Sequence, residues 1–158
     1  MSRNAVLFAL ALAATLPGCK GQAGGPGAAQ AVHGESGLAV IPLTITHAGQ
    51  QHRFRAELAE SAFAQGKGLM FRTKLGPDEG MLFPMEPPRP ASFWMRNTVI
   101  PLDLLFVAPD GRIANIAANA KPYDERQLAS AGPVKAVLEL PGGRAAALGI
   151  VAGDAVSW

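Results

Sequence analysis

The chain has 158 residues and a formal net charge of +2, and this length fits a single domain. Because the charge is small and no run of basic residues occurs, the sequence gives no support for nucleic-acid binding. Its single Cys excludes an intrachain disulfide and a Cys-based zinc site, while 18 Gly and 13 Pro favour turns and short strands over a helical bundle.

The N-terminus has the pattern of an export signal. Arg3 precedes an apolar stretch at residues 5–16, which is shorter than the roughly 20 residues that span a bilayer. The stretch is followed by Pro17-Gly18-Cys19, which with Leu16 resembles the lipobox of bacterial lipoproteins. The resemblance implies that residues 1–18 are a signal peptide and that Cys19 carries the lipid. An ordinary secretory signal with an incidental Cys is the alternative.

A lipid on Cys19 would anchor the protein in the cell envelope, facing the periplasm, with the membrane as its partner. Lys20 stands where Asp usually retains such proteins at the inner membrane, which favours the outer membrane. Residues 20–37 contain almost no bulky apolar side chain, so residues 19–37 are predicted to be the lipidated Cys and a flexible tether. The folded domain is expected at residues 38–158.

The domain is predicted to consist mostly of short strands. Alternating apolar and polar residues begin at residues 38–47, and Pro109-Asp110-Gly111 predicts a hairpin turn between two apolar runs. The expected strands cover residues 38–47, 52–58, 81–85, 92–98, 102–108, 112–118, 134–140 and 155–158, and short helices are expected at 59–67 and 143–148. The predicted fold is mainly β, a β-sandwich or half-open barrel of about seven or eight short strands with two short helices.

Aromatic and polar side chains are concentrated between residues 68 and 103. This mixture is typical of an apolar pocket with a few polar groups that orient a ligand. Candidate ligand-binding residues are Arg72, Phe83, Phe93, Trp94, Met95, Asn97 and Asp103.

Asp103 interrupts the apolar run IPLDLLFV, and a buried carboxylate is costly unless it is paired. We therefore expect it to meet Arg72, Arg96 or Asn97, either in a structural ion pair between strands or at the mouth of the pocket.

Glu139 is a second carboxylate within an apolar strand, in the segment VLEL. It is expected to share a strand face with Val137 and Lys135, which favours exposure to solvent. If it met Asp103 in one cleft, the two would be the acid and base of a hydrolase-like enzyme, with Arg72 stabilising developing charge. The absence of His after residue 52 argues against a His base.

Four methionines fall within 26 residues, at Met70, Met81, Met85 and Met95. Thioethers are soft ligands that suit Cu(I), although methionine also fills gaps in ordinary cores. We expect core packing and no cofactor, and a Cu(I) site is the alternative.

Several linked motifs resemble those of the bacterial and archaeal domain of unknown function 192. The resemblance covers about residues 58–156 and implies a small mainly-β domain, often exported, without implying an activity. Pro141-Gly142-Gly143 departs from the usual pattern and is expected to alter the loop beside Glu139. The matching segments are 68–72 (GLMFR), 80–83 (GMLF), 93–98 (FWMRNT), 100–103 (IPLD), 137–140 (VLEL), 149–150 (GI) and 153–154 (GD).

Three functions fit these observations. The first is a lipid-anchored envelope binding module, with an aromatic and methionine pocket for an unknown small molecule or envelope protein. The second is an accessory protein for envelope structure or assembly, which would show an exposed apolar patch. The third is the carboxylate-based hydrolase-like enzyme. The binding module is the preferred interpretation.

Overall fold

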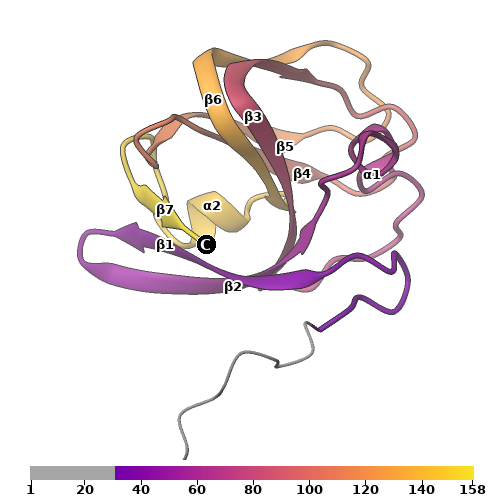
Figure 1. Cartoon of the computed structure of the whole chain (residues 1–158), viewed down its shortest axis with the longest axis horizontal. Coiled ribbons are helices and arrows are strands. Elements are labelled where there is room, and N and C mark those ends of the chain that lie inside the picture. The colour runs from indigo at the N-terminus through magenta and orange to yellow at the C-terminus, as the bar shows by residue number, and fades with distance from the viewer. Residues whose placement is uncertain (1–30) are drawn as a thin grey trace, which may run out of the picture.

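A computed structural model describes residues 31–158, so the predicted signal peptide, Cys19 and the start of the tether lie outside the described residues. The fold is mainly β with two short helices, as predicted (Figure 1). The elements are β1 (Val40–His47), β2 (Gln50–Leu58), α1 (Ala62–Lys67), β3 (Glu79–Phe93), β4 (Leu102–Val107), β5 (Ile113–Ala120), β6 (Leu128–Pro141), α2 (Arg144–Ala147) and β7 (Ala155–Ser157). Within residues 31–158, no helix has the length and apolar character needed to cross a membrane.

All seven strands belong to one curled sheet. Their order is β5-β4-β6-β3-β2-β1-β7, and every pair is antiparallel except β2 and β3. Arg112 and Ala155 form an isolated bridge that brings the β7 edge back to the start of β5. The sheet therefore forms the half-open barrel that was one of the two predicted forms, with α2 inside its curl and α1 outside it (Figure 1).

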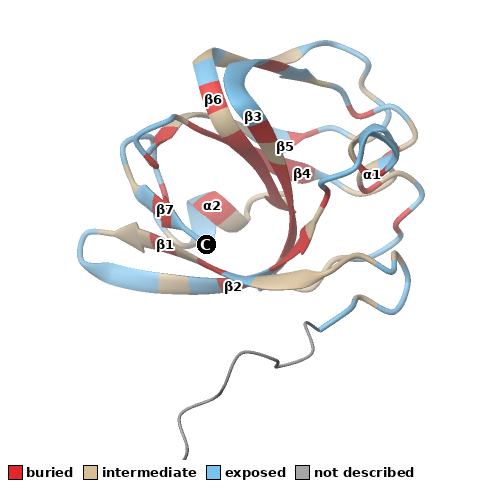
Figure 2. Ribbon diagram, viewed as in Figure 1, coloured by how far each residue is buried: buried red, intermediate tan, exposed pale blue. Residues whose placement is uncertain are grey.

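Apolar side chains cover both faces of the sheet. Inside the curl, Leu105 and Val107 of β4 pack with Ala145 of α2 in what we call the inner core. On the opposite face, Leu104 and Phe106 belong to a second cluster, the outer core, which also contains Phe83 of β3 and Val137 of β6. Every residue of β4 is buried as a result, and buried residues mark the central strands in Figure 2.

Two strands are longer than predicted. β3 continues through the proline-rich residues 86–90, which lie between two strands predicted separately, and β6 begins at Leu128. The register between these two strands shifts between Pro84 and Arg89, so the prolines lie where the ladder of backbone hydrogen bonds is already interrupted. The strand expected at residues 92–98 ends at Phe93, and the chain continues as a loop from Trp94.

Residues 31–37, the last part of the predicted tether, lie against the domain. Val32 bridges Ala39, and the side chains of His33 and Glu35 contact Arg72. The composition of this segment does not reveal these contacts, because they depend on a charged residue that is distant in sequence.

Candidate functional site

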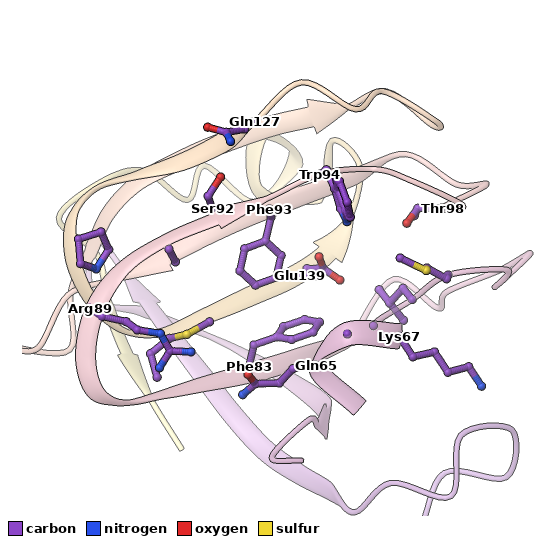
Figure 3. Close-up of a pocket in the computed structure, with 17 residues that line it drawn as sticks. Gln65, Lys67, Phe83, Arg89, Ser92, Phe93, Trp94, Thr98, Gln127 and Glu139 are labelled. Atoms are coloured by element: carbon purple, nitrogen blue, oxygen red, sulfur yellow. The ribbon is translucent and has the colours of Figure 1, made fainter. Parts of the chain in front are cut away.

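A cavity of about 540 Å³ opens on the outer side of the sheet (Figure 3). It lies between the segment that ends α1, the long strand β3 and the middle of β6. Its volume is within the range of small-molecule sites. The lining residues are Gln65, Gly66, Lys67, Gly68, Leu69, Met70, Phe83, Met85, Arg89, Pro90, Ala91, Ser92, Phe93, Trp94, Thr98, Gln127 and Glu139.

Three of the predicted aromatic residues line this cavity. The rings of Phe83 and Phe93 meet edge to face, with centroids 5.1 Å apart, and Phe93 also packs against Phe106 at 6.4 Å. These contacts fix the orientation of the Phe83 and Phe93 rings. Trp94 is 47% exposed and lies beneath the Arg96 guanidinium, 5.5 Å from the ring centroid. The sequence therefore identified the aromatic wall, and Trp94 is not buried in the core.

Glu139 lines the same cavity and is only 5% exposed, so the expectation that it faces solvent is wrong. The reason is that β6 lies between β3 and β4 in the middle of the sheet, where both faces are covered. Its sheet neighbours are Met81 and Leu104, both members of the outer core. Figure 3 shows the carboxyl group beside the rings of Phe83 and Phe93.

The Glu139 carboxyl forms no hydrogen bond or ion pair with residues 31–158. Burial raises its pKa to about 8, because the ionised form loses its hydration without gaining a partner. A strongly perturbed carboxyl in a cavity is a feature of functional sites.

Asp103 is fully buried on the inner side of the sheet and is not part of this cavity. Its carboxylate accepts hydrogen bonds from three backbone N–H groups, those of Asn119 at 2.7 Å, Gly143 at 3.0 Å and Ala145 at 2.8 Å. The prediction that a side chain of Arg72, Arg96 or Asn97 meets it is therefore wrong.

Two of the three N–H groups bound by Asp103 belong to the start of α2, where backbone donors have no partner within the helix. Gly143 precedes this helix with a φ of +81°, a conformation that glycine adopts without strain. The Gly142-Gly143 pair thus shapes the loop whose backbone N–H groups bind Asp103. It does not shape the surroundings of Glu139, contrary to the expectation from the sequence.

The two carboxylates point to opposite faces of the sheet. In the register of β4 and β6, Asp103 is opposite Leu140, while Glu139 is opposite Leu104. Because side chains alternate between faces along a strand, Asp103 lies on the inner side and Glu139 on the outer side. They do not share a cleft, so the geometry does not form the acid–base pair considered for a hydrolase.

Two more predicted site residues, Met95 and Asn97, do not line the cavity. Met95 is buried in the outer core, and the Asn97 side chain approaches the Met70 sulfur at 3.9 Å. The Asn97 carbonyl accepts a hydrogen bond from the N–H of Phe71 at 2.8 Å, and both residues have a positive φ. This pair fixes the loops that form one side of the cavity.

Arg72 lies in a charged group beside a second cavity of about 210 Å³. Its guanidinium pairs with Glu57 at 2.9 Å and Glu35 at 3.0 Å, and is 3.3 Å from the His33 ring. Arg72 and Glu57 are both buried. Glu57 was not singled out from the sequence, because its neighbours on β2 have the pattern of an ordinary strand and nothing local indicates a partner.

We expect Glu57→Gln to lower the free energy of unfolding by about 2 kcal/mol, because the buried guanidinium loses its closest counter-charge. Urea denaturation at neutral pH measures this loss. Glu60→Gln, at an exposed position nearby, is the matched control and should change little. A Glu57→Gln protein as stable as wild type would show that the pair is not stabilising.

The four methionines lie in or beside the outer core. Met81, Met85 and Met95 are all buried in the outer core, and Met70 and Met85 line the cavity. Among residues 31–158, no group of three or more His, Cys, Asp or Glu side chains is arranged to hold a metal ion. Met81 and Met85 pack in the core on either side of Phe83, as predicted.

Fold and site together define a small mainly-β domain, built on one curled sheet with a cavity on its outer side. The chain belongs to the DUF192 family, described as "Uncharacterized ACR", whose model matches residues 43–158. The family resemblance seen in the sequence motifs is thereby confirmed, and the match begins earlier in the chain than those motifs do.

The solved structures that resemble this chain include two crystal structures. A protein of unknown function from Novosphingobium aromaticivorans DSM 12444 is 60% identical, with a TM-score of 0.80 over 83% of this chain and 94% of its own. A protein from Sinorhizobium meliloti 1021, described as a "putative transcription regulator", is 40% identical, with a TM-score of 0.74 over 76% of this chain and 94% of its own. No match was found among curated proteins.

Proposed function

We propose that this protein is a lipid-anchored binding module of the cell envelope that holds a small molecule in the cavity of Figure 3. Ligand binding is supported by the environment of Glu139. This carboxyl is buried in the cavity, has no partner among the described residues and shares the cavity with three aromatic side chains. Burying an ionised carboxyl is unfavourable, and no group among residues 31–158 forms a hydrogen bond or ion pair with this one. A ligand that bonds to Glu139 would supply the missing partner.

Trp94→Ala tests the cavity as the binding site. A panel of envelope metabolites is screened by thermal shift on the full-length protein, and we expect a ligand-induced shift in wild type that Trp94→Ala abolishes. Because Trp94 is half exposed, the variant should lose less than about 1 kcal/mol of stability in the absence of ligand.

Trp158→Ala is the matched control for this screen, since Trp158 is 46% exposed and does not line the cavity. It should retain the shift seen in wild type. A panel that stabilises none of the three proteins, or a shift that persists in Trp94→Ala, would contradict the proposed site.

The envelope location rests on the lipobox at Leu16-Pro17-Gly18-Cys19. We expect the protein to fractionate with membranes and to incorporate labelled fatty acid, since more than one acyl chain is needed for stable anchoring. Cys19→Ser should abolish the labelling and release the protein from the membrane fraction. Membrane fractionation and labelling that are unchanged in Cys19→Ser would contradict lipidation at this residue.

A role as an assembly accessory is the second candidate, and it is supported by two exposed aromatic side chains. Phe63 is 80% exposed and Phe71 is 65% exposed, and both line the cavity of about 210 Å³. Exposed aromatic residues grouped at one place are typical of a protein contact. Crosslinking in intact envelopes that is lost in Phe63→Ser would favour this function.

A further inference from the structure

We infer that the ligand of the cavity is an organic amine with an apolar body, bound with its ammonium group against the Glu139 carboxylate and the aromatic rings around it. This inference rests on the proposed function and narrows it to a class of ligand.

The charge arrangement of the cavity favours a cation at its floor. The charged residues that line it are Lys67 of α1, Arg89 of β3 and Glu139 of β6. Lys67 and Arg89 are exposed, so solvent and salt screen their charges, and neither forms an ion pair with Glu139. Glu139 is buried, so its charge acts at much lower effective dielectric once the carboxyl is ionised. The interior of the cavity therefore presents one acidic group that has no cationic side chain of the described residues beside it.

The aromatic residues favour the same class of ligand. Phe83 and Phe93 lie beside the carboxyl group, and Trp94 forms the half-exposed part of the wall (Figure 3). Ring faces carry partial negative charge and attract ammonium groups within about 6 Å of their centroids. The rings also provide an apolar surface for the body of the ligand. A carboxylate ligand would find no counter-charge at Glu139 and would be repelled by the ring faces.

Binding of an ammonium ion requires the ionised form of Glu139. Because burial raises the pKa of this carboxyl to about 8, it holds its proton at neutral pH in the free protein. When the ammonium ion binds, the Glu139 proton leaves to solvent and an ammonium–carboxylate pair forms. Amine affinity should therefore rise as the pH increases from 6 to 8, with up to one proton released per ligand bound.

Isothermal titration calorimetry of the full-length protein at pH 7.5 tests this inference with three probes of similar shape. They are 2-phenylethylamine, the neutral 2-phenylethanol and the anionic 3-phenylpropionate. We expect the amine to bind at least tenfold more tightly than either of the others. Repeating the titration in buffers with different ionisation enthalpies should show the release of a proton.

Glu139→Gln keeps the shape of the side chain and removes its charge. We expect it to weaken amine binding at least tenfold, to abolish proton release and to leave 2-phenylethanol binding unchanged. Glu125→Gln, at an exposed position outside the cavity, is the matched control and should bind the amine as wild type does.

Equal affinity for the amine and the alcohol, or amine binding that survives in Glu139→Gln, would overturn the amine assignment and leave the cavity as a binding site. Failure of 2-phenylethylamine to bind wild type would also overturn it. The proposed function is judged separately, by the loss of ligand-induced stabilisation in Trp94→Ala.

Discussion

Replacing Asp103 with Ala should lower the free energy of unfolding by about 4 kcal/mol, because three backbone N–H groups lose their shared acceptor at once. Asp103→Asn should lower the free energy of unfolding by about 2 kcal/mol. The amide oxygen can keep the bonds from Asn119 and Gly143, while the amide nitrogen, itself a donor, faces the N–H of Ala145. Urea denaturation of the full-length protein at neutral pH measures both losses.

Asp110→Ala is the control for this series, because Asp110 is exposed and accepts a single bond from the N–H of Arg112 at 3.0 Å. We expect it to lose less than about 1 kcal/mol. Equal stability of Asp103→Ala and wild type would contradict the assignment of Asp103 as the residue that holds the start of α2. The Asp103 variants should also keep any ligand shift of the wild type, since this residue lies on the opposite face from the cavity.

Glu139→Gln should make the protein more stable above neutral pH, with an advantage over wild type on the order of 3 kcal/mol at pH 8. The carboxyl has an ordinary pKa of 4.5 when the chain is unfolded and a pKa of about 8 when it is folded. Between these values the folded state holds a proton that the unfolded state has lost, so unfolding releases a proton and stability falls as the pH rises.

The advantage of Glu139→Gln should therefore be small at pH 5 and should grow up to about pH 8, beyond which both states are ionised. Urea denaturation of wild type and variant at several pH values between 5 and 8 measures the difference. The other titratable groups are common to both proteins, so their contributions to the pH dependence of stability largely cancel in the difference. A difference that does not change with pH would show that Glu139 is hydrated or paired in the folded state.

The sequence was sufficient for the architecture because strand alternation and turn residues are local signals. The hairpin around Pro109-Asp110-Gly111 and the strand at residues 102–108 follow directly from such signals, and both are present. The extent of β3 was not predictable in this way. Its prolines lie where β6 pairs with it across an irregular register, and that partner segment lies about 45 residues away in sequence.

The candidate site was predicted in part, for a similar reason. Phe83, Phe93 and Trp94 were identified because aromatic residues gathered in a short segment are visible in the sequence. The environments of the two carboxylates were not predictable. Periodicity suggests which face of a strand a residue occupies, but it does not show whether that face is covered, as for Glu139. Periodicity also does not show that Asp103 is hydrogen-bonded by backbone N–H groups and not paired with a cation.

The central claim is that Glu139 is a desolvated, unpartnered carboxyl in a ligand cavity, and a carbon-13 NMR titration of the glutamate carboxyl groups tests it most directly. The Glu139 resonance is identified by its loss in Glu139→Gln. We expect it to titrate near pH 8 in the free protein, and saturating 2-phenylethylamine to lower its pKa by about one unit or more. A Glu139 carboxyl that titrates near its ordinary value of 4.5 would contradict the account.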